Sequence, residues 1–121
     1  MKSGFKDLNV YQKAFELAMD IFKTSQQFPS EELYSLTSQI RRSSRSVCSN
    51  IGEGYRKRLY EAHFISKMSD ADMENSETQV WLDFALECKY LSEEIYQDYL
   101  YRSQEVGCLI SAMIKNPYKF R

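Results

Sequence analysis

A chain of 121 residues has the length of about one domain. Apolar residues make up 43% of it and aromatic residues 14%, which excludes a disordered chain, and four glycines with two prolines leave too few turns for an all-β fold. A formal net charge of −1 argues against steering toward nucleic acid by whole-molecule charge. We therefore expect one all-α domain over residues 1–121.

The sequence shows no apolar run long enough to cross a membrane. The first residues, MKSGFKDL, also lack the apolar core of a signal peptide. We therefore expect a cytoplasmic protein without a membrane segment.

The first predicted helix covers residues 8–28. Val10, Leu17 and Ile21 belong to an apolar stripe at helical spacing, and a second stripe that includes Tyr11 and Phe15 lies beside it. An apolar face of this width predicts contact with more than one neighbouring element.

The second predicted helix covers residues 31–55, with Ser30 as its N-terminal cap. Ser43 and Ser44 interrupt its apolar stripe with small side chains, which predicts a close crossing by a neighbouring helix. Gly52 and Gly54 are poor interior helix residues and predict the end of the helix, because each costs about 1 kcal/mol relative to alanine.

Two further helices are predicted over residues 60–90 and 93–116, with Ser92 capping the last one. Four helices of this length with short connections predict an antiparallel, up-down-up-down four-helix bundle. The three widely spaced cysteines fit neither a disulfide framework nor a zinc site, so we expect buried free thiols at Cys48, Cys88 and Cys108.

Charge is distributed unevenly along the chain. Residues 38–58 carry six basic side chains and one acidic side chain, whereas residues 59–105 carry three basic and eleven acidic ones. The basic set can contact phosphates, since guanidinium groups bind them through paired hydrogen bonds. The alternative interpretation is salt bridging to the acidic third helix, in the same subunit or the next. The candidate residues are Arg41, Arg42, Arg45, Arg56, Lys57 and Arg58.

The end of the second helix carries a group of residues to which we assign a structural role: Asn50, Gly52, Glu53 and Gly54. Asn50 and Glu53 are expected to hydrogen-bond loop backbone or a neighbouring helix at the glycine break. No partner base or metal for a catalytic role is evident in the sequence.

No catalytic or metal motif is recognisable. His63 is the only histidine, which excludes the paired Glu-x-x-His ligands of di-iron bundles. Asp70, Asp72 and Glu74 begin like a calcium loop, but Trp81 stands where the final glutamate should be. We therefore expect no enzyme activity, no metal and no cofactor.

Four motifs along the chain are distinctive: FKDLNVYQKA at 5–14, LTSQIRR at 36–42, SNIGEG at 49–54 and ETQVWLDFA at 77–85. In these motifs the chain resembles the four-helix-bundle family of proteins encoded in 23S ribosomal RNA intervening sequences, which is related to the accessory protein of diversity-generating retroelements. The resemblance implies a homopentamer and suggests nucleic acid or a reverse-transcriptase-like partner.

Two functional hypotheses follow. The first is a non-catalytic oligomeric binding module whose basic second helix contacts RNA or DNA phosphates, or a nucleic-acid-processing partner. The alternative is a purely structural scaffold in which the arginines form salt bridges between subunits.

Overall fold

The computed structural model describes residues 4–121, so residues 1–3 of the predicted domain lie outside the described part of the chain. The described residues form α-helices and short 3-10 helices and contain no β-strand. The α-helices are α1 (Asn9–Ser25), α2 (Leu36–Arg56), α3 (Glu61–Glu87) and α4 (Glu93–Lys115), and the 3-10 helices are η1 (Phe5–Asp7), η2 (Ser30–Glu32) and η3 (Pro117–Phe120). The predicted all-α class is confirmed.

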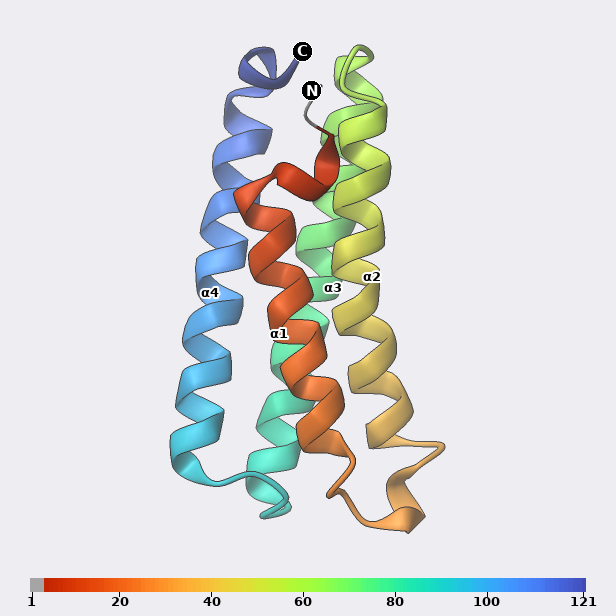
Figure 1. Ribbon diagram of the computed structural model, residues 1–121, viewed down its shortest axis with the longest axis vertical. Helices are drawn as coiled ribbons and strands as arrows, with labels where there is room; N and C mark the ends of the chain where they lie inside the picture. The colour runs from red at the N-terminus through yellow and green to blue at the C-terminus, as the bar shows by residue number, and fades with distance from the viewer. Residues whose placement is uncertain (1–3) are drawn as a thin grey trace.

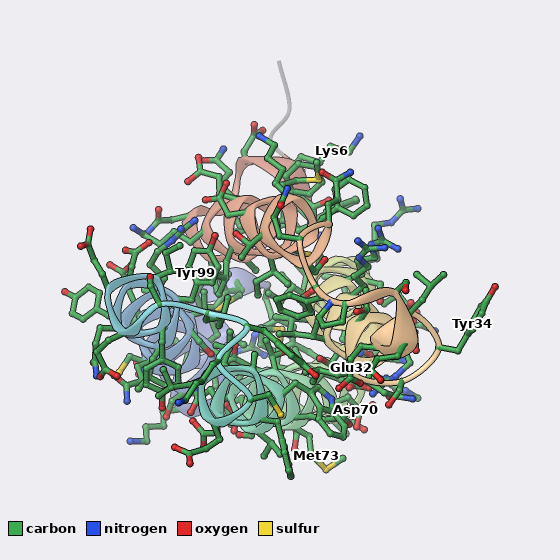
Figure 2. All side chains as sticks on the ribbon, turned by 90° about the horizontal axis from the view of Figure 1, so that it is seen from below. Lys6, Glu32, Tyr34, Asp70, Met73 and Tyr99 are labelled. Atoms are coloured by element: carbon green, nitrogen blue, oxygen red, sulfur yellow. The ribbon has the colours of Figure 1, made fainter. Side chains whose placement is uncertain are left out.

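Successive helices run in opposite directions along one long axis (Figure 1). Seen along that axis, α1, α2, α3 and α4 surround a centre filled by side chains (Figure 2). Therefore α1 has α2 and α4 as neighbours, and α3 lies across the bundle from α1.

Two apolar clusters stack along this axis. One contains Phe64, Met68 and Ile110, and the other contains Ile21, Ile40 and Leu82, all of them almost fully buried. Between the two clusters lies a layer of buried polar residues from three helices, namely Ser43, Ser44, Asn75, Thr78 and Ser103. The small side chains of this layer allow the close helix crossing that the sequence predicts, since Ser43 and Thr78 hydroxyls lie 2.8 Å apart across α2 and α3.

The start of α2 differs from the prediction. Residues 30–32 form the 3-10 turn η2, and α2 begins at Leu36, so Ser30 does not cap it. Glu32 serves this end of the helix instead, because its carboxylate accepts hydrogen bonds from the backbone N–H of Leu36 at 3.3 Å and from the Tyr90 hydroxyl at 2.9 Å. Glu32 is thereby held by a residue from the loop after α3.

The second helix ends at Arg56, one residue past its predicted end at 55, but Gly52 and Gly54 do not themselves end it. Both glycines are buried within α2, which continues to Arg56. A methyl group at Gly54 would meet Met68 Sδ and Lys67 Cβ of α3 at 3.1 Å, and one at Gly52 would meet the Phe5 ring at 3.3 Å. These glycines therefore allow close approach of neighbouring elements.

The remaining helix ends lie within a few residues of their predicted positions. The Ser92 hydroxyl accepts a hydrogen bond from the Ile95 N–H at 3.1 Å, which confirms the predicted cap of α4. Of the three cysteines, all free thiols, only Cys48 is buried; Cys88 and Cys108 are exposed, contrary to the prediction. No described helix is long and apolar enough to span a bilayer.

Candidate functional site

The six basic residues of α2 and its C-terminal end do not form one cluster. Arg42 faces α3, where its guanidinium pairs with Glu77 and, at 3.2 Å, with Glu74. Burial lowers the pKa of Arg42, but hydrogen bonds to Glu77 and Glu74 more than offset this and raise it overall. The predicted salt bridge to the acidic third helix is therefore present at Arg42, within one subunit.

Arg41 and Arg45 lie on the other side of α2, facing α1. Both guanidinium groups stack over the Phe22 ring, with their central carbons 4.7 and 5.5 Å from its centroid. Arg41 Nε also donates to Ser25 Oγ at 2.8 Å. Within the described chain neither arginine has a carboxylate partner, so their charges are held in place by an aromatic ring while remaining unneutralised.

A shallow hollow of about 700 Å³ covers this part of α2, and its lining residues are Leu33, Tyr34, Ser38, Arg41, Arg42, Arg45, Ser46 and Ser49. The serine side chains are short, which leaves space between the arginines. Ser38 and Ser49 donate to the Ser35 and Ser46 carbonyls of their own helix at 3.0 and 3.2 Å. The three arginines are the charged residues of the lining, so the hollow is positively charged.

The other three basic residues lie near the C-terminal end of α2. Arg58 folds back onto Tyr55, over whose ring its central carbon lies at 4.2 Å, and donates to the Tyr55 carbonyl at 3.0 Å. Arg56 and Lys57 border a second depression, described next. Because Arg56 follows Arg45 by eleven positions, the two are separated by about 16 Å along the helix.

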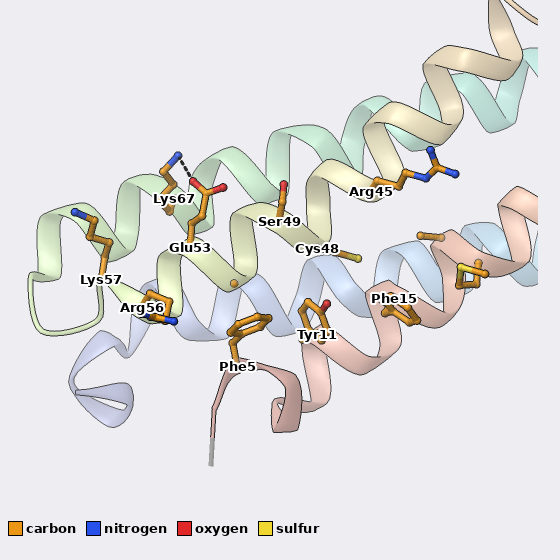
Figure 3. A pocket seen from close by; sticks show the side chains of 13 residues that line it. Phe5, Tyr11, Phe15, Arg45, Cys48, Ser49, Glu53, Arg56, Lys57 and Lys67 are labelled. Carbon is orange, nitrogen blue, oxygen red and sulfur yellow. Dashed lines mark ion pairs between the residues drawn. The ribbon is translucent and has the colours of Figure 1, made fainter. Parts of the chain in front are cut away.

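This second depression is an apolar groove of about 710 Å³ between α1 and α2, which we call the α1/α2 groove. Phe5, Tyr11 and Phe15 follow one another along its side (Figure 3). The ring of Tyr11 lies 5.1 Å from that of Phe5 and 6.0 Å from that of Phe15. Cys48 also lines the groove, and burial raises the pKa of its thiol to about 11.

The rim of the groove is cationic. It includes Arg45, Arg56 and Lys57 from α2 and its end, none of which has a carboxylate partner in the described chain. Glu53 is the acidic residue of the lining, and it pairs with Lys67 of α3 at 3.0 Å (Figure 3). An apolar floor with a cationic rim suits an occupant that is apolar in the middle and acidic at its edges.

Two of the residues assigned a structural role, Asn50 and Glu53, make different contacts. Asn50 donates to the carbonyl and the hydroxyl of Ser46 at 3.0 and 3.1 Å, one turn earlier in α2, so it contacts neither a loop nor another helix. Glu53 forms an ion pair with Lys67 of the neighbouring helix α3.

The α1/α2 groove is not among the sites that the sequence predicts. The sequence feature that could have indicated the groove is the second apolar stripe of the first helix, which includes Tyr11 and Phe15. Across residues 4–121, no three histidine, cysteine or acidic side chains gather as a metal site would require.

These features define a four-helix bundle with two depressions along α2. Residues 6–112 match the family model described as 23S rRNA-intervening sequence protein, and the chain belongs to that family. A solved structure from Bacteroides thetaiotaomicron, a protein of unknown function from the S23 ribosomal protein family, is similar to this chain. It is 30% identical with a TM-score of 0.79, and the match covers 88% of this chain and 95% of that one. No curated protein matches this chain.

Proposed function

We propose that this protein is a non-catalytic, self-associating binding module that contacts the phosphate backbone of RNA or DNA through Arg41 and Arg45. The observation that carries the proposal is the pair of guanidinium groups stacked on Phe22 without a carboxylate partner in the described chain. Cationic side chains held in place lose less conformational freedom on binding, and their planar groups suit phosphate oxygens.

Binding of this kind carries little sequence information. Phosphate contacts fix position and orientation, whereas sequence is read from base edges. We therefore expect similar affinity for unrelated sequences. The resemblance to accessory proteins of diversity-generating retroelements adds the expectation of a homopentameric ring, in which copies of the Arg41–Arg45 pair would bind one nucleic acid together.

Filter retention of a labelled single-stranded RNA at about 50 and 300 mM salt tests the proposal. Affinity should fall steeply, because each phosphate contact contributes a slope of about −0.7 to the logarithmic salt dependence for single strands. The double variant Arg41→Gln/Arg45→Gln should lower affinity at least tenfold, since hydrogen bonds to charged groups are each worth about 1.5–3 kcal/mol.

The charge-matched control is Lys115→Gln/Lys119→Gln, which removes two exposed cations at the end of α4 and in η3. It should retain most of the affinity. Equal binding at both salt concentrations, or equal loss in both double variants, would contradict phosphate contact by Arg41 and Arg45.

The second candidate function is a structural scaffold whose arginines pair with carboxylates of a neighbouring subunit. Its supporting observation is that an arginine of α2 pairs with carboxylates of α3, namely Arg42 with Glu74 and Glu77 of the same subunit, so Arg41 and Arg45 would pair likewise with carboxylates of the next subunit. Light scattering separates the two functions. If Arg41→Gln/Arg45→Gln dissociates the assembly, the scaffold is supported; if RNA retention is lost while the assembly persists, phosphate binding is supported.

A further inference from the structure

The outer face of α3 is apolar where solvent should favour charge. Met73, Val80 and Phe84 lie on one side of this helix with exposed fractions of 69%, 46% and 54%, and we call these three residues the α3 ridge. Its opposite side supplies Phe64 and Leu82 to the core. A helix with apolar side chains on two opposite sides usually packs against other elements on both of them.

The chemistry of the α3 ridge complements that of the α1/α2 groove. Carboxylates flank the ridge, and four of them have no cationic partner in the described chain: Asp70, Asp72, Asp83 and Glu87. The groove has an apolar floor, to which Phe15 and Met19 contribute surfaces that are 49% and 40% exposed, and its rim carries unpaired cations.

One copy cannot join its own two surfaces. The groove lies between α1 and α2, whereas Met73 of the ridge points away from the bundle on the side opposite α1 (Figure 2). Pairing of like surfaces is unfavourable, because ridge against ridge would bring carboxylates together and groove against groove would bring cations together.

We propose that the α3 ridge of one copy docks into the α1/α2 groove of the next. The inference rests on the self-association in the proposed function and deepens it by naming the two contacting surfaces. Such an interface is head-to-tail: every copy offers a ridge to one neighbour and a groove to another, so copies close into a ring when the rotation between them permits. Arg56 and Lys57 then face ridge carboxylates, and Arg45, which lines both the groove and the hollow on α2, lies at the edge of the interface, while Arg41 remains outside the groove.

Two variants, each with one disabled surface, test the proposal. Phe15→Asp places a carboxylate in the groove, and Val80→Asp places one on the ridge; both side chains are exposed in the monomer. Either aspartate would be buried against an apolar surface in the interface, which strongly disfavours docking. Light scattering should give the 14.3 kDa mass of one chain for each variant alone.

An equimolar mixture of the two variants is the decisive measurement. The intact ridge of Phe15→Asp can enter the intact groove of Val80→Asp. The second interface cannot form, because both of its surfaces carry an added carboxylate. We therefore expect a dimer containing one copy of each. Tyr101→Asp, which changes an exposed residue of α4, is the control and should keep the wild-type assembly.

The outcomes separate this inference from the proposed function. If the wild type is assembled but the single variants also stay assembled, or if their mixture gives no dimer, the pairing of ridge and groove is wrong while self-association stands. A monomeric wild type overturns the pairing together with self-association, whereas phosphate binding is decided independently by RNA retention. If circular dichroism shows that either aspartate variant is unfolded, Phe15→Asn and Phe84→Asn replace the pair with the same expected masses.

Discussion

Asn75 of α3 and Ser103 of α4 exchange two hydrogen bonds in the middle of the bundle. The Asn75 amide donates to the Ser103 carbonyl at 2.8 Å, and the Ser103 hydroxyl donates to the Asn75 side-chain oxygen at 2.9 Å. Gln79 also donates to the Ser103 hydroxyl at 2.9 Å, so this buried polar layer is well satisfied. Gly107 makes room for it, because a methyl group there would lie 3.3 Å from the Asn75 amide nitrogen.

Asn75→Ala should destabilise the protein by about 1–3 kcal/mol, since it removes a hydrogen-bond acceptor and donor from buried partners. Urea denaturation followed by circular dichroism measures the loss. Ser76→Ala, which changes the next and exposed residue of α3, is the control and should shift stability by less than about 0.5 kcal/mol. Equal stability of the two variants would show that this polar layer adds nothing to the folded state.

Gly54 and Gly52 should respond differently to alanine. Gly54→Ala gains helix propensity but forces its methyl group against the Lys67 Cβ and Met68 Sδ atoms, so we expect a net loss of about 1 kcal/mol. Gly52→Ala meets Phe5, a partly exposed residue of η1 that can shift, and should be neutral or stabilising by up to about 1 kcal/mol. A Gly54→Ala variant more stable than Gly52→Ala in the same urea titration would contradict the close crossing of α2 and α3.

Periodicity along the chain predicts all four helices, because each packs one apolar side against a common core. It predicts helix ends less well where a distant residue determines them. Glu32 reaches the start of α2 while bound to Tyr90, 58 residues away in the chain, so no local pattern marks this end. Gly54 lies inside α2 where Met68 of α3 leaves no room for a side chain, which its poor helix propensity does not reveal.

The candidate site shows the same limit. Charge counting predicts that some arginines of the second helix pair with the third, but not which ones. Arg41 and Arg42 are adjacent in sequence and differ by about 100° around the helix, so one faces α1 and the other α3. Only the packing of both neighbours distinguishes the arginine paired with Glu74 and Glu77 from the arginine stacked on Phe22.

Lys89 ends α3 in a conformation that normally belongs to glycine. Its φ is 65°, and the Tyr90 N–H donates to the Ala85 carbonyl at 2.8 Å while the Lys89 N–H donates to the Leu86 carbonyl at 2.9 Å. This is the hydrogen-bond pattern of a helix stop with a left-handed residue. Lys89→Gly should raise the free energy of unfolding by about 1 kcal/mol, because left-handed backbone costs other residues about 1–2 kcal/mol.

The matched control for this substitution is Lys57→Gly at the end of α2, where φ is −98°. It relieves no strain and adds freedom to the unfolded chain, so it should lower stability slightly. Thermal unfolding of both variants compares them directly. The same effect in both would argue against strain at Lys89.

The three thiols should fall into two classes by their rate of reaction. Cys88 and Cys108 are exposed, whereas burial raises the pKa of Cys48 to about 11 and leaves little thiolate at neutral pH. Titration of the native protein with a chromogenic disulfide should therefore show two fast thiols, with the third released by denaturant. In Cys48→Ala the fast count should stay at two and the slow thiol should vanish. Three fast thiols in the native protein would contradict the burial of Cys48.

The hydrogen bond between Glu32 and Tyr90 should make stability depend on pH at both extremes. The Tyr90 hydroxyl and the Leu36 N–H lower the pKa of Glu32 below its ordinary value of 4.5, and the bond to Glu32 raises the pKa of Tyr90 to about 12. A lowered carboxyl pKa stabilises the fold above pH 4.5, and this contribution is lost as pH falls through the folded value. A raised tyrosine pKa stabilises the fold below its ordinary value of 10.0, and this contribution is lost as pH rises toward 12.

Tyr90→Phe removes the hydroxyl and should therefore melt below the wild type near neutral pH, with a difference in Tm that narrows below about pH 4 and again above about pH 10. Differential scanning calorimetry across this range measures the difference. Tyr101→Phe, at an exposed position of α4, should follow the wild type at every pH. A Tm difference for Tyr90→Phe that stays constant down to about pH 3 would mean that the Tyr90 hydroxyl does not lower the pKa of Glu32 in the folded chain, and that this contact does not hold the start of α2.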